Sequence, residues 1–436
     1  MLGAQNRLTT VDEIIATAVR VTGASLPSVC VVSYVAALVL LGWSVWLIGV
    51  GLYRHTWTSV ALLAAFTLRH AIARSGTNTL EGYFHPRVLA FALGAAAIAL
   101  FLRRRMAGPL VLLVAAFALH PTTALWLIVW LTASAAIVYP SLRRYLAMLA
   151  AAAVIAAVWA LTAGPLAGRL SIMDPEWRQM LASKDYLFPL EWPAYAWMIN
   201  LGYLPVIAWI YRRRSRSGLV DAPERALVLG SSALALVFAC ALVLHVIGVT
   251  LAIQLQPARL FWMFDTLAII YAVWLIAEGG AGTFQKGPQL TATLVICFSI
   301  VRGAYVMTES GRTAVQVSLP DDDWGKVMGF ARTTEKGSGW LAHPLHAVLY
   351  GTSVRVAGER DVFVEAVKDT AIGMYDRDIA VRTTRRLAAV PDFTKLTASE
   401  AQKLGAEFHL NFIVTEEPLD LPLAFESGAI RVYRLE

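Results

Sequence analysis

Residues 77–87, T-N-T-L-E-G-Y-F-H-P-R, form a polar stretch between two hydrophobic segments. Glu81 and His85 in this stretch are spaced i, i+4, so their side chains would share one face if the stretch were helical. A carboxylate beside an imidazole suits a general base with its orienting partner, or two ligands of one metal ion. We therefore treat both as candidate catalytic residues. The structural alternative is a Glu–His pair that only hydrogen-bonds within a loop.

Two further histidines end apolar segments at the same predicted level. His120 stands before Pro121 in A-L-H-P-T-T-A-L-W, and His245 ends a later apolar segment. We expect His120 to join the catalytic set and His245 to help bind substrate, although a helix-terminal histidine bonded to a free carbonyl is the structural alternative. With Glu81 and His85 these histidines also offer ligands for a divalent cation, which remains an alternative cofactor, but we assign no residue to a metal.

Four arginines accompany these groups. Arg87 and Arg259 each follow a proline at the mouth of an apolar segment, where the backbone amides of a starting helix also favour anions. Because arginine is suited to bidentate recognition of phosphate, we expect both to bind substrate. Arg69 and Arg74 are weaker candidates for the same role, since arginines near helix ends often extend toward lipid headgroups instead.

The composition indicates a membrane protein that crosses the bilayer many times. Hydrophobic residues make up 58% of the chain and charged residues only 15%, whereas about a quarter of a soluble protein is charged. Residues 88–102 and 107–119 are shorter than the roughly 20 residues that a free-standing span needs. We predict a mainly α, polytopic helical membrane bundle of about nine or ten spans, at residues 27–53, 56–73, 88–102, 107–119, 121–139, 145–163, 193–211, 226–252, 258–277 and 288–308.

The arginine runs predict the orientation of these spans. Residues 103–105, 143–144 and 212–216 carry the runs, and they fall on one side if the spans alternate. Lys and Arg accumulate in short cytoplasmic loops, which also explains the net charge of +7 without a nucleic-acid partner. The extracytoplasmic side then carries residues 77–87, the His120–Pro121 corner, residues 164–192, residues 254–259 and everything after Met307.

The chain divides into three predicted parts. Residues 1–26 form an outer-surface segment with an amphipathic helix, residues 27–308 form the transmembrane domain, and residues 318–436 form a small extracytoplasmic α/β domain. In the last part we expect helices at 324–333 and 398–405 and strands at 340–342, 362–367, 412–415 and 430–435.

The order of three short motifs resembles a known family. E-G-Y-F-H-P-R is followed by H-P-T-T-A-L-W and Q-L-Q-P-A-R, and the outer C-terminal domain ends L-D-L-P-L-A-F-E-S-G-A-I-R-V-Y-R-L. Together they resemble the bacterial integral-membrane proteins of the GT-C glycosyltransferase superfamily. The resemblance implies a location in the bacterial cytoplasmic membrane and a polyprenyl-phosphate or diphosphate sugar as donor. It also implies that Arg87 and Arg259 bind the donor phosphate and that Glu81, His85 and His120 line the transfer site.

The sequence departs from this family at its start. Such enzymes usually carry a catalytic acid in the first outer loop, after a first span, whereas Asp12 and Glu13 precede the first apolar segment here. We expect this arrangement if the chain lacks the first span of the family and Asp12 and Glu13 are the remnant of that loop; the alternative is that the catalytic acid is missing.

The leading hypothesis is transfer of a lipid-linked sugar to an acceptor at the extracytoplasmic face, with the lipid-linked donor and membrane lipid as partners. The alternatives are a transporter or flippase of lipid-linked glycan and an inactive membrane scaffold.

Overall fold

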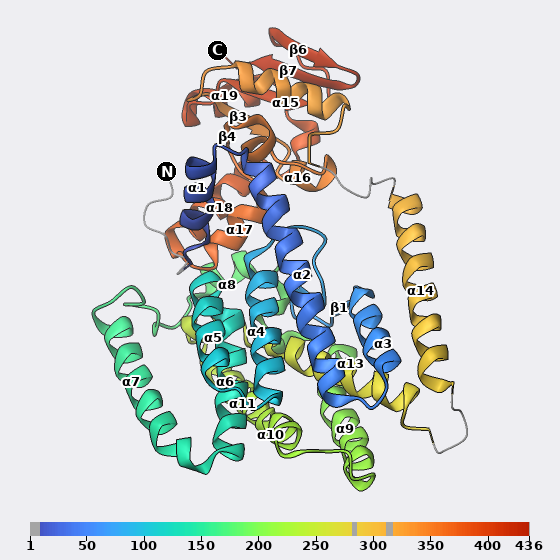
Figure 1. Ribbon diagram of the computed structural model, residues 1–436. Helices are drawn as coiled ribbons and strands as arrows, with labels where there is room; N and C mark the ends of the chain where they lie inside the picture. The colour runs from blue at the N-terminus through green and yellow to red at the C-terminus, as the bar shows by residue number, and fades with distance from the viewer. Residues whose placement is uncertain (1–8, 281–285, 311–316, 436) are drawn as a thin grey trace. The chain divides into compact units, whose positions relative to one another are not determined.

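The computed structural model describes residues 9–280, 286–310 and 317–435, and these form two compact units (Figure 1). The first unit comprises Met1–Met173 and Lys184–Ala314. The second comprises Asp174–Ser183 and Val315–Glu436, so a short segment from the middle of the chain belongs to the C-terminal unit.

The first unit is helical, as predicted. All ten apolar segments contain helices, but the helix in the segment predicted at 56–73 ends at Thr67, before strand β1 (Ala71–Ile72), and the segment predicted at 226–252 is interrupted at Ser231 and Gly248. The helices are α1 (Val11–Thr22), α2 (Leu26–Leu52), α3 (Thr56–Thr67), α4 (Pro86–Leu102), α5 (Ala107–Leu119), α6 (Pro121–Val138), α7 (Arg143–Thr162), α9 (Ala194–Arg216), α10 (Ala222–Gly230), α11 (Ser232–Ile247), α12 (Thr250–Gln254), α13 (Phe261–Ala277) and α14 (Gly287–Ser310).

The helix lengths and compositions show a multi-pass membrane protein. Among the described residues six helical segments are long and apolar enough to cross a bilayer, and α3, α4 and α5 are shorter apolar helices. None of α7 is buried in the protein, whereas α13 is buried along most of its length. Because α7 is apolar on all sides, its exposed surface suits contact with lipid.

Three candidate spans lie between the two stretches that make up the second unit, at Ala222–Ile247, Thr250–Ala277 and Gly287–Glu309. The 23-residue helix α9, which is free of charge up to Tyr211, lies in the same part of the chain.

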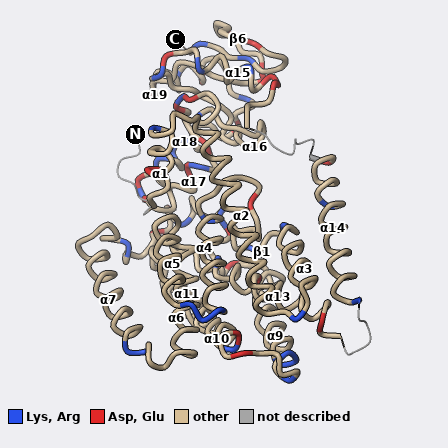
Figure 2. Tube along the Cα trace, in the orientation of Figure 1, with Lys and Arg blue, Asp and Glu red and all other residues tan. Residues whose placement is uncertain are grey.

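Positive side chains gather at one end of the first unit. Figure 2 shows Lys and Arg where α4 and α9 end and where α7 begins. A buried ion pair fixes the helices there: Arg214 Nε lies 2.7 Å from Glu224 Oε1, and Tyr271 donates its hydroxyl hydrogen bond to the same carboxylate oxygen at 2.9 Å. The starts of α4 and α6 lie at the opposite end of their helices, away from this cluster.

The second unit is a mixed five-stranded sheet with helices, which confirms the predicted fold class. The strand order is β4-β3-β5-β7-β6, with β3 parallel to β4 and β5, and β7 antiparallel to β5 and β6. The strands are β3 (Gly339–Ala342), β4 (Asp361–Val362), β5 (Phe412–Thr415), β6 (Leu423–Ser427) and β7 (Ile430–Arg434), and the helices include α8 (Pro175–Leu181), α15 (Asp323–Thr333), α16 (His346–Leu349), α17 (Ala366–Gly373), α18 (Arg377–Ala389) and α19 (Ala398–Phe408).

Successive side chains along the strands point to opposite faces of the sheet, and both faces are apolar. Trp340 and Val414 join one buried cluster, while Leu341 and Ile413 join the other. Helix α19 begins with a capping box in which Thr397 and Glu400 satisfy each other's backbone amides, as its sequence predicts. The strand expected at 362–367 is shorter, because the chain turns into α17 at Ala366.

Helix α8 is held in the second unit by polar contacts. Trp177 donates its indole N–H to the Gly373 carbonyl at 2.7 Å. Arg377 contacts Asp174, the N-cap of α8, at 2.6 Å and Glu176 at 3.2 Å. These contacts tie a loop of the chain between α7 and α9 to the C-terminal sheet unit.

Candidate functional site

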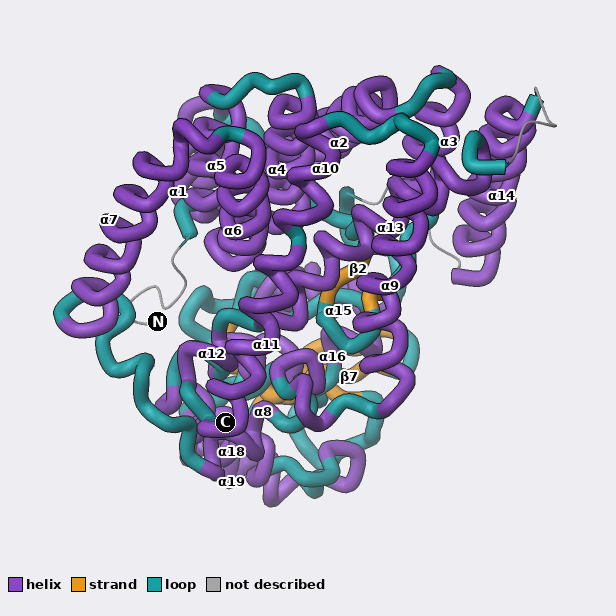
Figure 3. Tube along the Cα trace, turned by 90° about the horizontal axis from the view of Figure 1, so that it is seen from below, coloured by secondary structure: helices purple, strands orange, loops and turns teal. Residues whose placement is uncertain are grey.

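The stretch at 77–87 is not helical. It begins with strand β2 (Thr77–Asn78), which pairs with β1 (Ala71–Ile72) in a hairpin beside α13 (Figure 3), and it then runs in a loop to α4. Pro86 occupies the first turn of α4, and a proline disfavours helical backbone at the residue before it, which is His85 here. Glu81 and His85 therefore do not share a helix face, and each has its own environment.

Glu81 is an anchor within the protein. It is 2% exposed and accepts hydrogen bonds from the Arg87 guanidinium and, at 3.0 Å, from the Asn78 side-chain amide. Arg69 approaches the same carboxylate at 3.7 Å. Arg87 also donates to the Gly76 carbonyl at 3.0 Å. The carboxylate thus positions Arg87 and closes the loop.

His85 and His120 cap two neighbouring helices in the same way. The His85 Nδ1 accepts the backbone N–H of Arg87 at 3.2 Å at the start of α4, and the His120 Nδ1 accepts the N–H of Thr123 at 3.3 Å at the start of α6. The ring centroids lie 5.9 Å apart. A backbone N–H can only donate, so both Nδ1 atoms are unprotonated and each neutral ring carries its hydrogen on Nε2. Each imidazole therefore carries an N–H donor on Nε2 and no basic nitrogen.

Two guanidinium groups lie near this histidine pair. Burial, followed by the positive charge of Arg259 and then His85 and Arg87, holds the pKa of His120 well below its ordinary value. His120 lies in the turn between α5 and α6. Because its pKa is lowered, the neutral donor form of the ring persists at physiological pH. Two imidazole N–H groups beside two guanidinium groups form an environment suited to an anion.

The segment that carries Arg259 has an unusual backbone. Arg259 lies in the short helix η4 (Pro257–Leu260), and the preceding Gln256 is buried with a φ of 53°. A non-glycine residue in this left-handed region costs about 1–2 kcal/mol, and such strain clusters at functional sites. The Arg259 guanidinium lies 5.9 Å from the centre of the Tyr186 ring. Nothing in the local sequence pattern around Tyr186 indicates this contact, which joins segments far apart in the chain.

The remaining predicted binding residues lie in other environments. Arg74 pairs with Asp185 and donates to the Tyr195 hydroxyl at 2.9 Å, on an exposed surface. The His245 ring nitrogens lie 2.8 Å from the Ala241 carbonyl and 3.1 Å from the Leu187 carbonyl. Those contacts correspond to the structural alternative for a helix-terminal histidine, and they connect α11 to the η2 turn (Asp185–Leu187).

Asp265, a buried carboxylate on α13, has a partner from the hairpin region. His70 Nε2 and the Tyr203 hydroxyl both lie 2.9 Å from its Oδ1. The hydrogen bond to Asp265 raises the pKa of His70. Within the described ranges no three His, Cys, Asp or Glu side chains converge as metal ligands do.

Helix α1 begins next to the histidine pair. The Thr9 and Thr10 hydroxyls donate to the carbonyls of Leu119 and Ala118 at 2.8 and 2.9 Å, directly before His120. Asp12 and Glu13 lie in the first turn of α1 and are exposed. The hydrogen bonds therefore hold the start of α1, which carries these two residues, against the end of α5.

No protein-family model matches the sequence, and comparison with curated proteins finds no match.

Proposed function

We propose that this protein transfers a sugar from a polyprenyl-phosphate-linked donor to an acceptor at the extracytoplasmic face of a bacterial cytoplasmic membrane. The observation that carries the proposal is the anion-suited cluster of His85, His120, Arg87 and Arg259, from three separate segments of a multi-pass membrane protein. The cluster lies where α4 and α6 begin, away from the arginine-rich helix ends that the positive-inside rule assigns to the cytoplasm.

The chemistry of the cluster fits the leaving group of such a reaction. In the transfer the acceptor oxygen forms a bond to the anomeric carbon, and the bond between that carbon and the donor phosphate oxygen breaks. The phosphate leaves with the bonding electron pair, and Arg259 with the two Nε2–H groups stabilises its growing negative charge. Arg87 is held in place by Glu81, which balances its charge, so Arg87 contributes a guanidinium N–H donor near the same point rather than a second net positive charge.

The acceptor hydroxyl must also lose a proton to a base. The hydrogen bonds of His85 and His120 leave a donor on each ring, so neither neutral histidine suits this role. Glu81 is engaged by Arg87 and Asn78. We assign the base to Asp12 or Glu13, because Thr9 and Thr10 bind the start of α1 beside His120.

A membrane assay with radiolabelled polyprenyl-phosphate sugars tests the proposal. We expect turnover by the native chain and losses of about 10²–10³-fold in kcat for His120→Ala and Arg259→Gln, the range found when one charge-stabilising donor is removed. His55→Ala and Arg105→Gln serve as matched controls, because both side chains are exposed at the opposite end of their helices. We expect the controls to retain full activity.

Two outcomes would contradict the proposal. If the site variants and controls turn over alike, the cluster is not the transfer site. If no donor is turned over but a fluorescent polyprenyl-phosphate lipid crosses proteoliposomes that contain the chain, the protein is a flippase.

A further inference from the structure

The end of α9 carries four arginines, of which one is buried and three are exposed. Arg214 is buried, pairs with Glu224 and lies 5.1 Å from the centre of the Trp274 ring. Arg212, Arg213 and Arg216 are exposed. Arg214 therefore holds the helices together, and the other three require a separate explanation.

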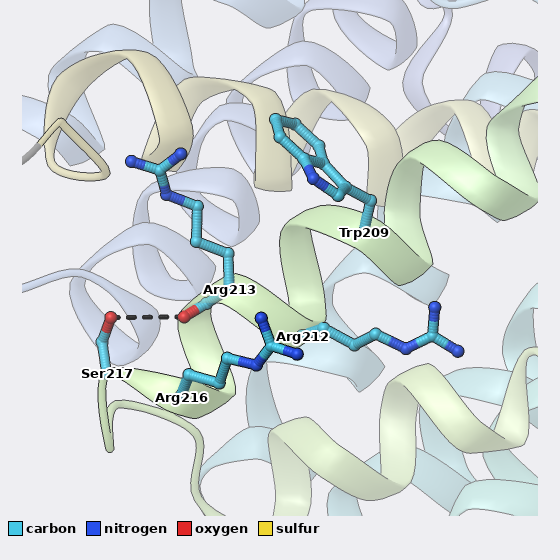
Figure 4. Close-up of a pocket in the computed structure, with 5 residues that line it drawn as sticks. All are labelled: Trp209, Arg212, Arg213, Arg216 and Ser217. Carbon is cyan, nitrogen blue, oxygen red and sulfur yellow. Dashed lines mark hydrogen bonds between the residues drawn. The ribbon is translucent and has the colours of Figure 1, made fainter.

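The three exposed arginines surround a hollow. Its volume is about 610 Å³, and it is lined by Trp209, Arg212, Arg213, Arg216 and Ser217 (Figure 4). Figure 4 shows the Arg212 and Arg213 side chains extending to opposite sides, with Arg216 between them. The spacing of residues 209, 212, 213 and 216 is i, i+3, i+4, i+7, so α9 presents them on one face.

The positive charge in this hollow is not neutralised by the described part of the protein. No carboxylate is among the lining residues, and no hydrogen bond or ion pair joins the guanidinium group of Arg212 or Arg216 to another described residue. Arg213 donates to the Gly279 carbonyl at 2.6 Å, which leaves its charge in place. The helix C-terminus offsets the equivalent of only about half a charge. A net positive charge remains to attract an anion.

The surroundings of the hollow resemble the edge of a bilayer. Trp209 is 53% exposed and lies one helical turn before Arg213, on an otherwise apolar helix. Tryptophan with adjacent arginines is typical of the membrane–water interface, where the ring lies at headgroup level and the cations meet lipid phosphates. An anion at this depth is more readily a lipid phosphate than a soluble ion.

We propose that the hollow at the end of α9 binds the phosphate headgroup of an anionic phospholipid from the adjoining leaflet. The guanidinium groups of Arg212 and Arg216 contact the phosphate, and Trp209 packs against the glycerol and upper acyl chains. This site lies at the opposite end of the unit from the histidine pair and does not depend on the proposed transfer activity. General positive charge at the membrane surface is the competing explanation, and the test separates the two.

Native mass spectrometry of the full chain from detergent, titrated with phosphatidylglycerol or phosphatidylcholine, tests the proposal. An arginine that contacts the lipid headgroup contributes about five-fold to the affinity for anionic lipid, whereas Arg104 and Arg105 do not line the hollow. We therefore expect the double variant R212Q/R216Q to bind phosphatidylglycerol roughly 25-fold more weakly than the native chain. The matched control is R104Q/R105Q, which removes two exposed arginines from the same end of the unit. We expect the control to change affinity less than two-fold.

Three results would overturn the site. Equal weakening by the two double variants would indicate a general surface charge effect. If the native chain bound phosphatidylcholine as tightly as phosphatidylglycerol, the site would have no selectivity for an anionic headgroup. Displacement of the lipid by inorganic phosphate at comparable concentration would indicate a free-phosphate site. A thermal unfolding measurement of R212Q/R216Q confirms that any loss comes from a folded protein.

Discussion

Glu81 is the residue for which the structure makes the most specific prediction. Its carboxylate and the Arg87 guanidinium form a buried pair, with side-chain exposures of 2% and 9%. Replacing Glu81 by Gln removes one partner and leaves the Arg87 charge buried without compensation. Breaking such a pair costs about 3–5 kcal/mol. At about 2 °C for each kcal/mol in a unit of this size, the apparent Tm should fall by roughly 6–10 °C.

A thermal unfolding series in detergent measures this effect. Arg74→Gln is the matched control, because it breaks an ion pair with Asp185 whose side chains are 39% and 47% exposed. An exposed pair contributes about 0–1 kcal/mol, so the control should shift Tm by no more than about 2 °C. The double variant Glu81→Gln/Arg87→Gln should recover part of the loss, because no uncompensated charge remains.

The opposite pattern would refute the reasoning. If Glu81 were a catalytic base with little structural role, Glu81→Gln would abolish transfer while leaving Tm unchanged. An unchanged Tm in Glu81→Gln would therefore show that the carboxylate does not anchor Arg87.

Two further predictions concern the packing of each unit. Arg377→Gln should increase hydrogen exchange in α8, because Arg377 contacts both Asp174 and Glu176. Arg377 also holds the pKa of Asp174 below its ordinary value of about 3.9. The stabilising contact is therefore complete above that pH and is lost as the pH falls through the lower pKa of the folded state. Unchanged exchange in the variant at neutral pH would contradict this role. Gly230→Ala should lower the free energy of unfolding by about 1–3 kcal/mol, because an added Cβ would lie 2.8 Å from the Ser134 backbone nitrogen. Gly202→Ala is the control, because an added Cβ there would meet nothing within 4 Å, and it should leave Tm unchanged or slightly raised. Equal Tm values for the two glycine variants would show that the close approach of α10 to α6 is not required.

Much of the architecture follows from the sequence alone. Uninterrupted apolar segments bounded by arginine runs or prolines have to form helices in a bilayer, because backbone polar groups find no partner in lipid. The apolar segments therefore predicted where most helices lie, but not the end of α3 at Thr67 or the breaks that separate α10, α11 and α12. In the C-terminal unit the Thr397 cap and the alternation in strands such as Phe412–Thr415 predicted those elements, while α17, α18 and β6 lacked an equally clear local pattern.

The sequence also determined which residue types were available for chemistry, but the tertiary structure decided what each side chain does. His85 and His120 are neighbours only because α4 and α6 begin side by side, and their Nε2–H form depends on hydrogen bonds to Arg87 and Thr123. Asp265 pairs with His70 rather than with Arg259, which is nearer in sequence, because the β1–β2 hairpin lies beside α13. Periodicity reports only contacts within one helix or strand, whereas these contacts join segments far apart in the chain.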